Sequence, residues 1–199
     1  MQPNYFPDQD ADRRKWVLMT GVAAGCAAVA VAVPFVSSLA PSERARAMGA
    51  SVEVDIAGID PGGIVTVEWR GKPVWILRRT AEMLADLATL NDKLVDPGSE
   101  REQQPAYAKN PYRSIKEEFV VLVGICTHLG CSPNSVPKGS SNPSVGENWS
   151  GGFFCPCHGS TFDLAGRVFK NKPAPMNLEV PPYKYITATR LLIGENDSA

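Results

Sequence analysis

Two short boxes contain nearly all of the cysteines and histidines of this chain. The first is residues 126–131, CTHLGC, and the second is residues 155–160, CPCHGS. Together they hold four of the five cysteines and both histidines of the 199 residues. A random scatter would almost never place the only two histidines beside cysteines in two matched segments. We therefore predict one site and a fold that brings the two boxes together.

Thiolate and imidazole are ligands of zinc and iron. Each box offers one cysteine and one histidine for a shared centre, namely Cys126 with His128 and Cys155 with His158. Cys131 and Cys157 are surplus to four ligands, and a disulfide between them would persist in an oxidising compartment. The residues alone leave a second reading open, in which four thiolates bind one zinc ion in a structural module.

The N-terminal part predicts a membrane anchor. Residues 17–40 are 24 consecutive uncharged residues, and a helix of about this length crosses a bilayer core of roughly 30 Å. Arg13 and Arg14 precede them and resemble a twin-arginine export signal. We expect residues 1–16 in the cytoplasm and a retained transmembrane helix, in which Cys26 is a packing residue. The alternative is a removable signal peptide, cleaved after the small residues at 38–40.

The remainder is predicted to be a linker followed by an all-β domain. Residues 41–50 are small or polar and predict a linker that permits a mobile head, and residues 51–199 form the head. Strands are expected at 52–56, 64–69, 74–77, 119–125, 153–154, 185–188 and 190–193, with a turn at 70–73. Thr80 is expected to cap a short helix, while the segments 91–118 and 132–152 are expected to be surface loops.

Charge excludes one large class of partner. The chain has 20 basic and 21 acidic residues and a net charge of -1. A nucleic-acid-binding protein needs a clustered basic excess to neutralise phosphates. We therefore expect no nucleic-acid partner.

The boxes, the anchor, the linker and the proline-rich segment 172–183 closely resemble the Rieske iron–sulfur proteins, in particular the subunit of bacterial ubiquinol–cytochrome c reductases (cytochrome bc complexes). The resemblance implies an antiparallel β sandwich with a small cluster-binding subdomain at about 120–180, preceded by a single transmembrane helix. It also implies one [2Fe-2S] cluster, with Cys126 and Cys155 on the inner iron, His128 and His158 on the outer iron, and a disulfide between Cys131 and Cys157.

The resemblance further implies roles for single residues. His158 would contact quinol and take its proton, with His128 as the solvent-facing partner, and Leu129 would dock on other subunits. The Ser160 hydroxyl would donate to a bridging sulfide. The head would accept an electron from ubiquinol at the cytochrome b subunit and pass it to the c-type cytochrome subunit. This implies a dimeric complex in the bacterial inner membrane, with the head in the periplasm.

Two positions depart from the family pattern, and two other functions remain open. Phe162 stands where many family members of high potential carry tyrosine, so we expect a lower potential here. Lys172, before the proline loop, has no explanation in the sequence. The first rival function is the Rieske small subunit of a periplasmic oxidase such as arsenite oxidase. The second is the structural zinc module.

Overall fold

A computed structural model describes residues 7–42 and 49–196. The chain divides into two units, residues 1–47 and residues 48–199, and each is described by itself. Most of the predicted linker, residues 41–50, lies between the two described ranges, and the predicted boundaries of anchor, linker and head stay predictions.

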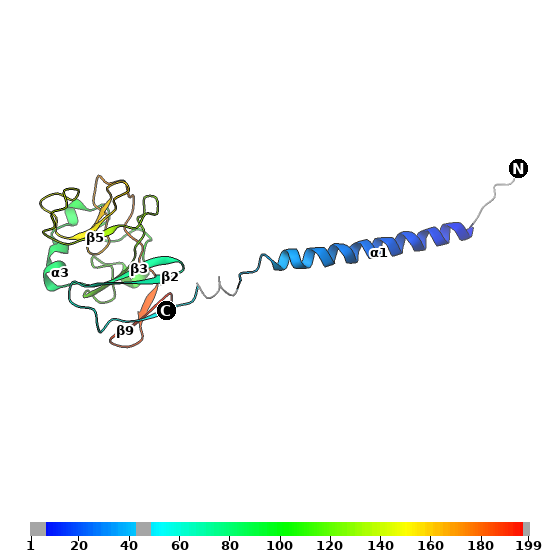
Figure 1. Ribbon diagram of the computed structural model, residues 1–199, viewed down its shortest axis with the longest axis horizontal. Helices are drawn as coiled ribbons and strands as arrows, with labels where there is room; N and C mark the ends of the chain where they lie inside the picture. The colour runs from blue at the N-terminus through cyan, green and yellow to red at the C-terminus, as the bar shows by residue number, and fades with distance from the viewer. Residues whose placement is uncertain (1–6, 43–48, 197–199) are drawn as a thin grey trace. The chain divides into compact units, whose positions relative to one another are not determined.

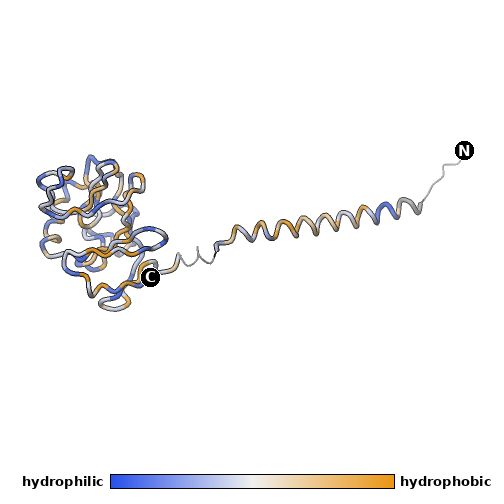
Figure 2. Tube along the Cα trace, in the orientation of Figure 1, coloured by the Kyte–Doolittle hydropathy of each residue, from blue (hydrophilic) through white to orange (hydrophobic). Residues whose placement is uncertain are grey.

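In its described residues, 7–42, the first unit contains one long helix, α1 (Pro7–Ser37) (Figure 1). Within it Ala11–Ser37 is long and apolar enough to cross a membrane, and it contains an 18-residue window with a mean hydropathy of 2.1 (Figure 2). The prediction of one apolar N-terminal helix is thus confirmed. The helix ends earlier than the predicted span of 17–40, because residues 38–40 form a turn whose N–H groups donate to the last carbonyls of the helix.

The described part of the second unit, residues 49–196, is built on three antiparallel sheets of three strands each, so the predicted all-β head is confirmed. The first sheet has the order β1 (Val52–Asp55), β9 (Arg190–Ile193), β8 (Tyr183–Tyr185). The second has the order β2 (Ile64–Trp69), β3 (Lys72–Arg78), β4 (Phe119–Val123). The third has the order β5 (Asn134–Val136), β6 (Gly152–Phe154), β7 (Thr161–Phe162).

The second sheet delivers the chain to the first box. Arg70 and Gly71 both have positive φ, 53° and 70°, which is typical of a two-residue hairpin turn. The predicted four-residue turn is therefore wrong, because Lys72 and Pro73 already pair with β2. Strand β4 pairs with β3 and is buried at every position, as its apolar sequence predicts.

A stacked aromatic pair joins the second sheet to the third. Trp75 in β3 and Phe153 in β6 have ring centroids 4.8 Å apart. Gly124 follows β4, and a Cβ atom at this position would lie 2.4 Å from the Trp75 ring. Only glycine fits there, so this close approach lets the strands that precede both boxes share one core.

The short helices lie between β3 and β4. They are α3 (Ala81–Ala88) and the 3-10 helices η1 (Asn91–Lys93) and η2 (Ala106–Ala108). The Met83 N–H donates to the Thr80 hydroxyl oxygen at 3.2 Å, which confirms the predicted cap.

Three predicted segments differ in the structure. The last hairpin has β8 at 183–185 rather than at 185–188, because the chain turns back after Tyr185 so that Ile186 N–H donates to the Arg190 carbonyl. The segment 91–118 is not a surface excursion, since it buries Arg113 completely. The insert 132–152 includes β5 and the buried Trp149. The polar composition of segments 91–118 and 132–152 made both look like exposed loops. Their polar groups can be buried because they find hydrogen-bond partners in the folded chain.

Candidate metal centre

The first box forms a six-residue loop closed by two backbone hydrogen bonds. The Cys126 N–H donates to the Cys131 carbonyl at 2.7 Å, and the Gly130 N–H donates to the Cys126 carbonyl at 3.0 Å. Strand β4 ends three residues before Cys126, so a rigid buried strand positions the loop. This cysteine is 2% exposed.

The second box repeats this geometry after β6. The Cys155 N–H donates to the Ser160 carbonyl at 2.8 Å, and the Gly159 N–H donates to the Cys155 carbonyl at 2.9 Å. The fifth residue of each loop is a glycine with positive φ, +83° at Gly130 and +77° at Gly159. Glycine adopts this conformation without strain, so both loops turn in the same way.

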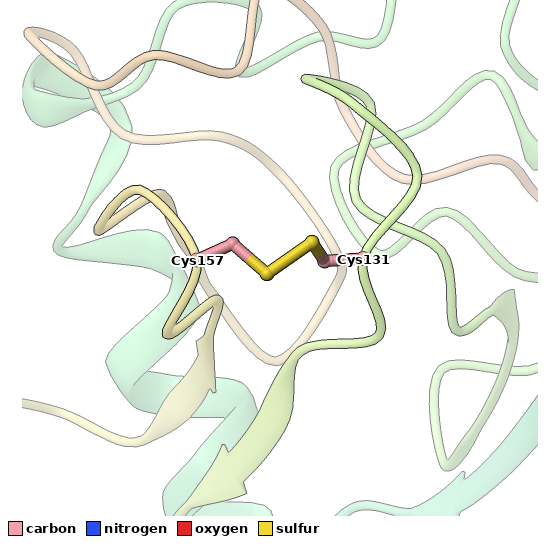
Figure 3. Close-up of a disulfide and its surroundings, with 2 residues drawn as sticks. All are labelled: Cys131 and Cys157. Atoms are coloured by element: carbon pink, nitrogen blue, oxygen red, sulfur yellow. A yellow bond between two sulfur atoms is a disulfide. The ribbon is translucent and has the colours of Figure 1, made fainter.

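A disulfide joins the two loops (Figure 3). It links Cys131 to Cys157 across a Cα–Cα distance of 6.7 Å. This is the pairing that the family resemblance implies. The sulfurs of these two cysteines lie within 4.8 Å of the Cys155 sulfur, but two of the three are already bonded to each other, so this trio is not a set of metal ligands.

Two buried cysteines in the boxes remain free thiols, Cys126 and Cys155. Burial raises the pKa of the Cys126 thiol, and the neighbouring Cys155 thiol raises it further, against hydrogen bonds that lower it. A thiolate is therefore unfavourable here without a compensating positive charge. A metal ion supplies that charge and deprotonates a coordinating thiol.

The two histidine side chains, one from each box, lie against each other. Their rings lie 4.7 Å apart at an interplanar angle of 90°. The Nδ1 atom of His128 is buried and has no hydrogen-bond partner among the described residues, whereas the His158 side chain is exposed. Burying an unpartnered polar atom costs free energy, which a metal bond at Nδ1 would remove. The two free thiols and two imidazoles thus fit a mixed sulfur and nitrogen metal centre.

The proline-rich segment is tied to both boxes. The Thr127 hydroxyl donates to the Met176 carbonyl at 2.6 Å, and the Ala174 N–H donates to the Ser160 hydroxyl oxygen at 3.0 Å. The Ser160 hydroxyl proton is not used in that bond, so its predicted donation to a sulfide stays a prediction. Sequence reasoning missed Thr127, although a hydroxyl between two predicted ligands was a usable signal.

Three other residues singled out in the sequence have clear positions. Leu129, at the tip of the first box, is 71% exposed. Phe162 in β7 is completely buried and pairs with Phe153. Lys172 is exposed at the start of the proline-rich segment. The described residues make no contact that tests the predicted docking role of Leu129 or that explains Lys172.

Buried arginines behind the second box were not foreseen. Arg79 donates to the Leu164 carbonyl at 3.5 Å, and Arg113 donates to the Ala165 carbonyl at 3.2 Å. Arg167 forms a fully buried ion pair with Asp163 at 2.7 Å. Burial lowers the pKa of Arg79 and of Arg113 to about 10. These contacts fix the turn that follows β7, and no sequence pattern marks arginines as core residues.

Comparison with known proteins agrees with this geometry. Residues 101–184, which include both boxes, match the family model of the Rieske [2Fe-2S] domain. The ubiquinol–cytochrome c reductase iron–sulfur subunit of Allochromatium vinosum is 55% identical over 92% of this chain and 88% of its own length. The subunit of the same name from Blastochloris viridis is 40% identical over 93% of this chain and 94% of its own length.

Among solved structures, a chain of a hyperthermophilic respiratory Complex III has 26% identity and a TM-score of 0.46, over 87% of this chain and 98% of that chain. A TM-score at this level adds nothing to the argument, which stands on the sequence relatives and on the two closed loops. The chain therefore belongs to the family of Rieske [2Fe-2S] proteins that are the iron–sulfur subunits of ubiquinol–cytochrome c reductases.

Proposed function

We propose that this chain binds its [2Fe-2S] cluster through the four ligands that the boxes bring together. Cys126 and Cys155 hold one iron through sulfur, and His128 and His158 hold the other through nitrogen. The observation that carries this assignment is the pair of free buried thiols beside a pair of imidazoles, one with a buried, unpartnered Nδ1. The disulfide leaves these four groups as the metal-binding side chains of the two loops.

When bound, the cluster supplies a one-electron acceptor whose potential is raised because neutral imidazoles replace two anionic thiolates. Around it the protein excludes water from the sulfur side, where both cysteines are 2% exposed. The exposed His158 ring presents its outer nitrogen to an incoming quinol and takes the proton of the quinol hydroxyl there. Leu129, which follows His128 in the first box, supplies an exposed apolar contact for docking.

We infer the partners from the names of the relatives. The chain works as the iron–sulfur subunit of a bacterial cytochrome bc complex, takes electrons from ubiquinol at the cytochrome b subunit and passes them to the c-type cytochrome subunit. One apolar N-terminal helix supports a single membrane anchor. The twin arginines at 13 and 14 support a cytoplasmic N-terminus and a periplasmic head, and the family supports a dimeric complex.

An electron paramagnetic resonance spectrum of reduced membranes from cells expressing the chain tests this proposal. We expect the signal of a histidine-ligated [2Fe-2S] cluster, with an average g value below that of clusters with four cysteine ligands. The line shape should change when an inhibitor of quinol oxidation is added. A signal that ignores the inhibitor would favour the relay subunit of a periplasmic oxidase.

Matched cysteine variants test the ligand assignment. Cys126→Ser should abolish the signal because it removes a sulfur ligand of the cluster. Cys26→Ser is the control, since Cys26 is a free cysteine in α1 outside both boxes, and its spectrum should be unchanged. Retention of the native signal in Cys126→Ser would overturn the assignment.

A further inference from the structure

A hollow of about 440 Å³ lies in the head beside the second box. Its lining includes Lys93, Lys170, Lys172, Trp149, Phe169 and Thr161. Its volume is within the range of small-molecule sites in proteins, roughly 300–1,000 Å³. Nothing in the predicted chemistry of the cluster requires this hollow.

Backbone hydrogen bonds hold its lysine-bearing segments together. The Lys170 N–H donates to the Lys93 carbonyl at 2.8 Å, and the Val95 N–H donates to the Val168 carbonyl at 3.0 Å. The Lys170 ammonium group also donates to the Asp92 carbonyl at 2.8 Å. The segments that carry Lys93 and Lys170 therefore lie side by side, and all three lysines line the same hollow.

The hollow concentrates positive charge in a chain whose net charge is -1. Three lysines line it, and Asp92 is the single acidic residue among the described residues of its wall. Within residues 7–42 and 49–196, none of the three lysines takes part in an ion pair. Clustered ammonium groups without counter-charges attract anions, and lysine is a common phosphate ligand in proteins.

An aromatic wall completes the hollow. Trp149 is 9% exposed, and its indole N–H donates to the Val136 carbonyl at 2.9 Å. The Trp149 and Phe169 rings lie 5.7 Å apart. These rings are fixed by neighbouring residues, so they form a preorganised apolar surface for the organic part of a ligand.

We propose that this hollow binds a soluble phosphate monoester. The phosphate group contacts the ammonium groups of Lys93, Lys170 and Lys172, and the organic group packs on Trp149 and Phe169. A free inorganic phosphate would use the charges alone and leave the aromatic wall in water. The ligand class is therefore a phosphate carried on an apolar or aromatic group.

The hollow lies next to the second box, which holds two of the proposed cluster ligands. Thr161, in the wall of the hollow, directly follows Ser160 of the second box, and Lys172 begins the segment whose Ala174 binds the Ser160 hydroxyl. An anion bound here stabilises the more positive, oxidised cluster. The midpoint potential therefore falls on binding, and by reciprocity the oxidised protein binds the anion more tightly. This link rests on the proposed ligand assignment, whereas binding in the hollow does not.

Isothermal calorimetry on the full-length chain, in a detergent without phosphate groups, tests the binding. Phenyl phosphate and inorganic phosphate have the same charge at alkaline pH and differ in the ring. We expect saturable binding of phenyl phosphate, weaker binding of inorganic phosphate, and loss of affinity as salt increases. No saturable binding of phenyl phosphate, or equal affinity for both anions, would overturn the proposal.

Lysine variants identify the site. The double variant Lys93→Ala with Lys172→Ala should weaken phenyl phosphate binding by at least about tenfold, because it removes two charge-assisted contacts. Lys109→Ala is the control, since Lys109 is exposed, pairs with Glu100 and does not line the hollow, and its affinity should be unchanged. Undiminished binding in the double variant would refute the assignment. Competition from nanodiscs that contain phosphatidic acid would identify a lipid head group and would equally overturn a soluble ligand.

A redox titration measures the link to the cluster separately. At constant ionic strength, phenyl phosphate should lower the midpoint potential of the wild-type chain and leave that of the double variant unchanged. Calorimetric binding with no change in midpoint would remove the link while leaving the cluster assignment intact.

Discussion

At the scale of single residues, each box combines metal-binding side chains with a glycine that closes the loop. The thiols of Cys126 and Cys155 are buried, and both loops turn at a glycine of positive φ. Burial raises the pKa of the Cys126 thiol, so the fold by itself disfavours the thiolate that a metal needs at this position. The fold supplies the position of each ligand, and the bound metal offsets the cost of the charge.

Phe162→Tyr should raise the midpoint potential. Phe162 is completely buried next to the second box, and a phenol there adds a hydrogen-bond donor that stabilises the more negative, reduced cluster. A redox titration followed by electron paramagnetic resonance measures the change. Phe119→Tyr, at the start of β4, is the control and should leave the potential unchanged. A midpoint that does not rise in Phe162→Tyr would contradict the prediction.

Two tyrosines of strand β8 predict a loss of stability at alkaline pH. Burial raises the pKa of Tyr185 to about 12 and raises that of Tyr183 as well. The fold therefore favours the neutral phenols, and their contribution to the free energy of unfolding is complete below the unfolded pKa of about 10. It is lost as the pH rises from there toward the folded values.

Denaturant unfolding at pH 9 and at about pH 11 measures this loss. Tyr185→Phe should reduce the pH dependence, since the Tyr185 hydroxyl is buried and has no hydrogen-bond partner in the described part of the chain. An identical pH dependence in the variant would show that another group titrates in this range.

At the scale of elements, the position of the metal-binding residues depends on the two strands that end at the boxes. Strand β4 leads to Cys126 and β6 leads to Cys155. The Trp75–Phe153 stack packs the second sheet against the third. The apolar sequence of β4 predicted a buried strand. The stack could not be predicted, because it joins residues 78 positions apart.

Gly124→Ala should destabilise the head. The added Cβ would meet the Trp75 ring at 2.4 Å, and overpacking of a core costs about 1–3 kcal/mol of unfolding free energy. Gly58→Ala is the control because its Cβ would meet no atom within 4 Å. Thermal unfolding of the three proteins compares them. Equal unfolding temperatures for Gly124→Ala and the wild type would show that the ring moves without cost.

At the scale of the whole molecule, an apolar helix and a head are joined by a segment predicted to be a linker. The family assignment requires the head to exchange electrons with two partners. A moving head explains why a small polar linker separates the helix from the first strand, and this explanation stays a prediction.

Prolines at Ala47 and Gly49 test it, because proline stiffens the backbone. Quinol-dependent cytochrome c reduction by the assembled complex should slow, while the cluster spectrum stays the same. Alanine at Gly58 again serves as a control and should leave turnover unchanged. Unaffected turnover in the proline variant would count against a moving head.

The sequence by itself determined the metal-binding residue types, the apolar N-terminal helix, the Thr80 cap and the buried strand before Cys126. These are local properties, set by side-chain chemistry and by the spacing of apolar residues. Only the tertiary structure decided that the histidine rings meet, that three arginines are buried behind the second box, and that three lysines line one hollow. Such contacts join distant segments, and their formation depends on the free energy of the whole fold, in which most buried polar groups need a hydrogen-bond partner.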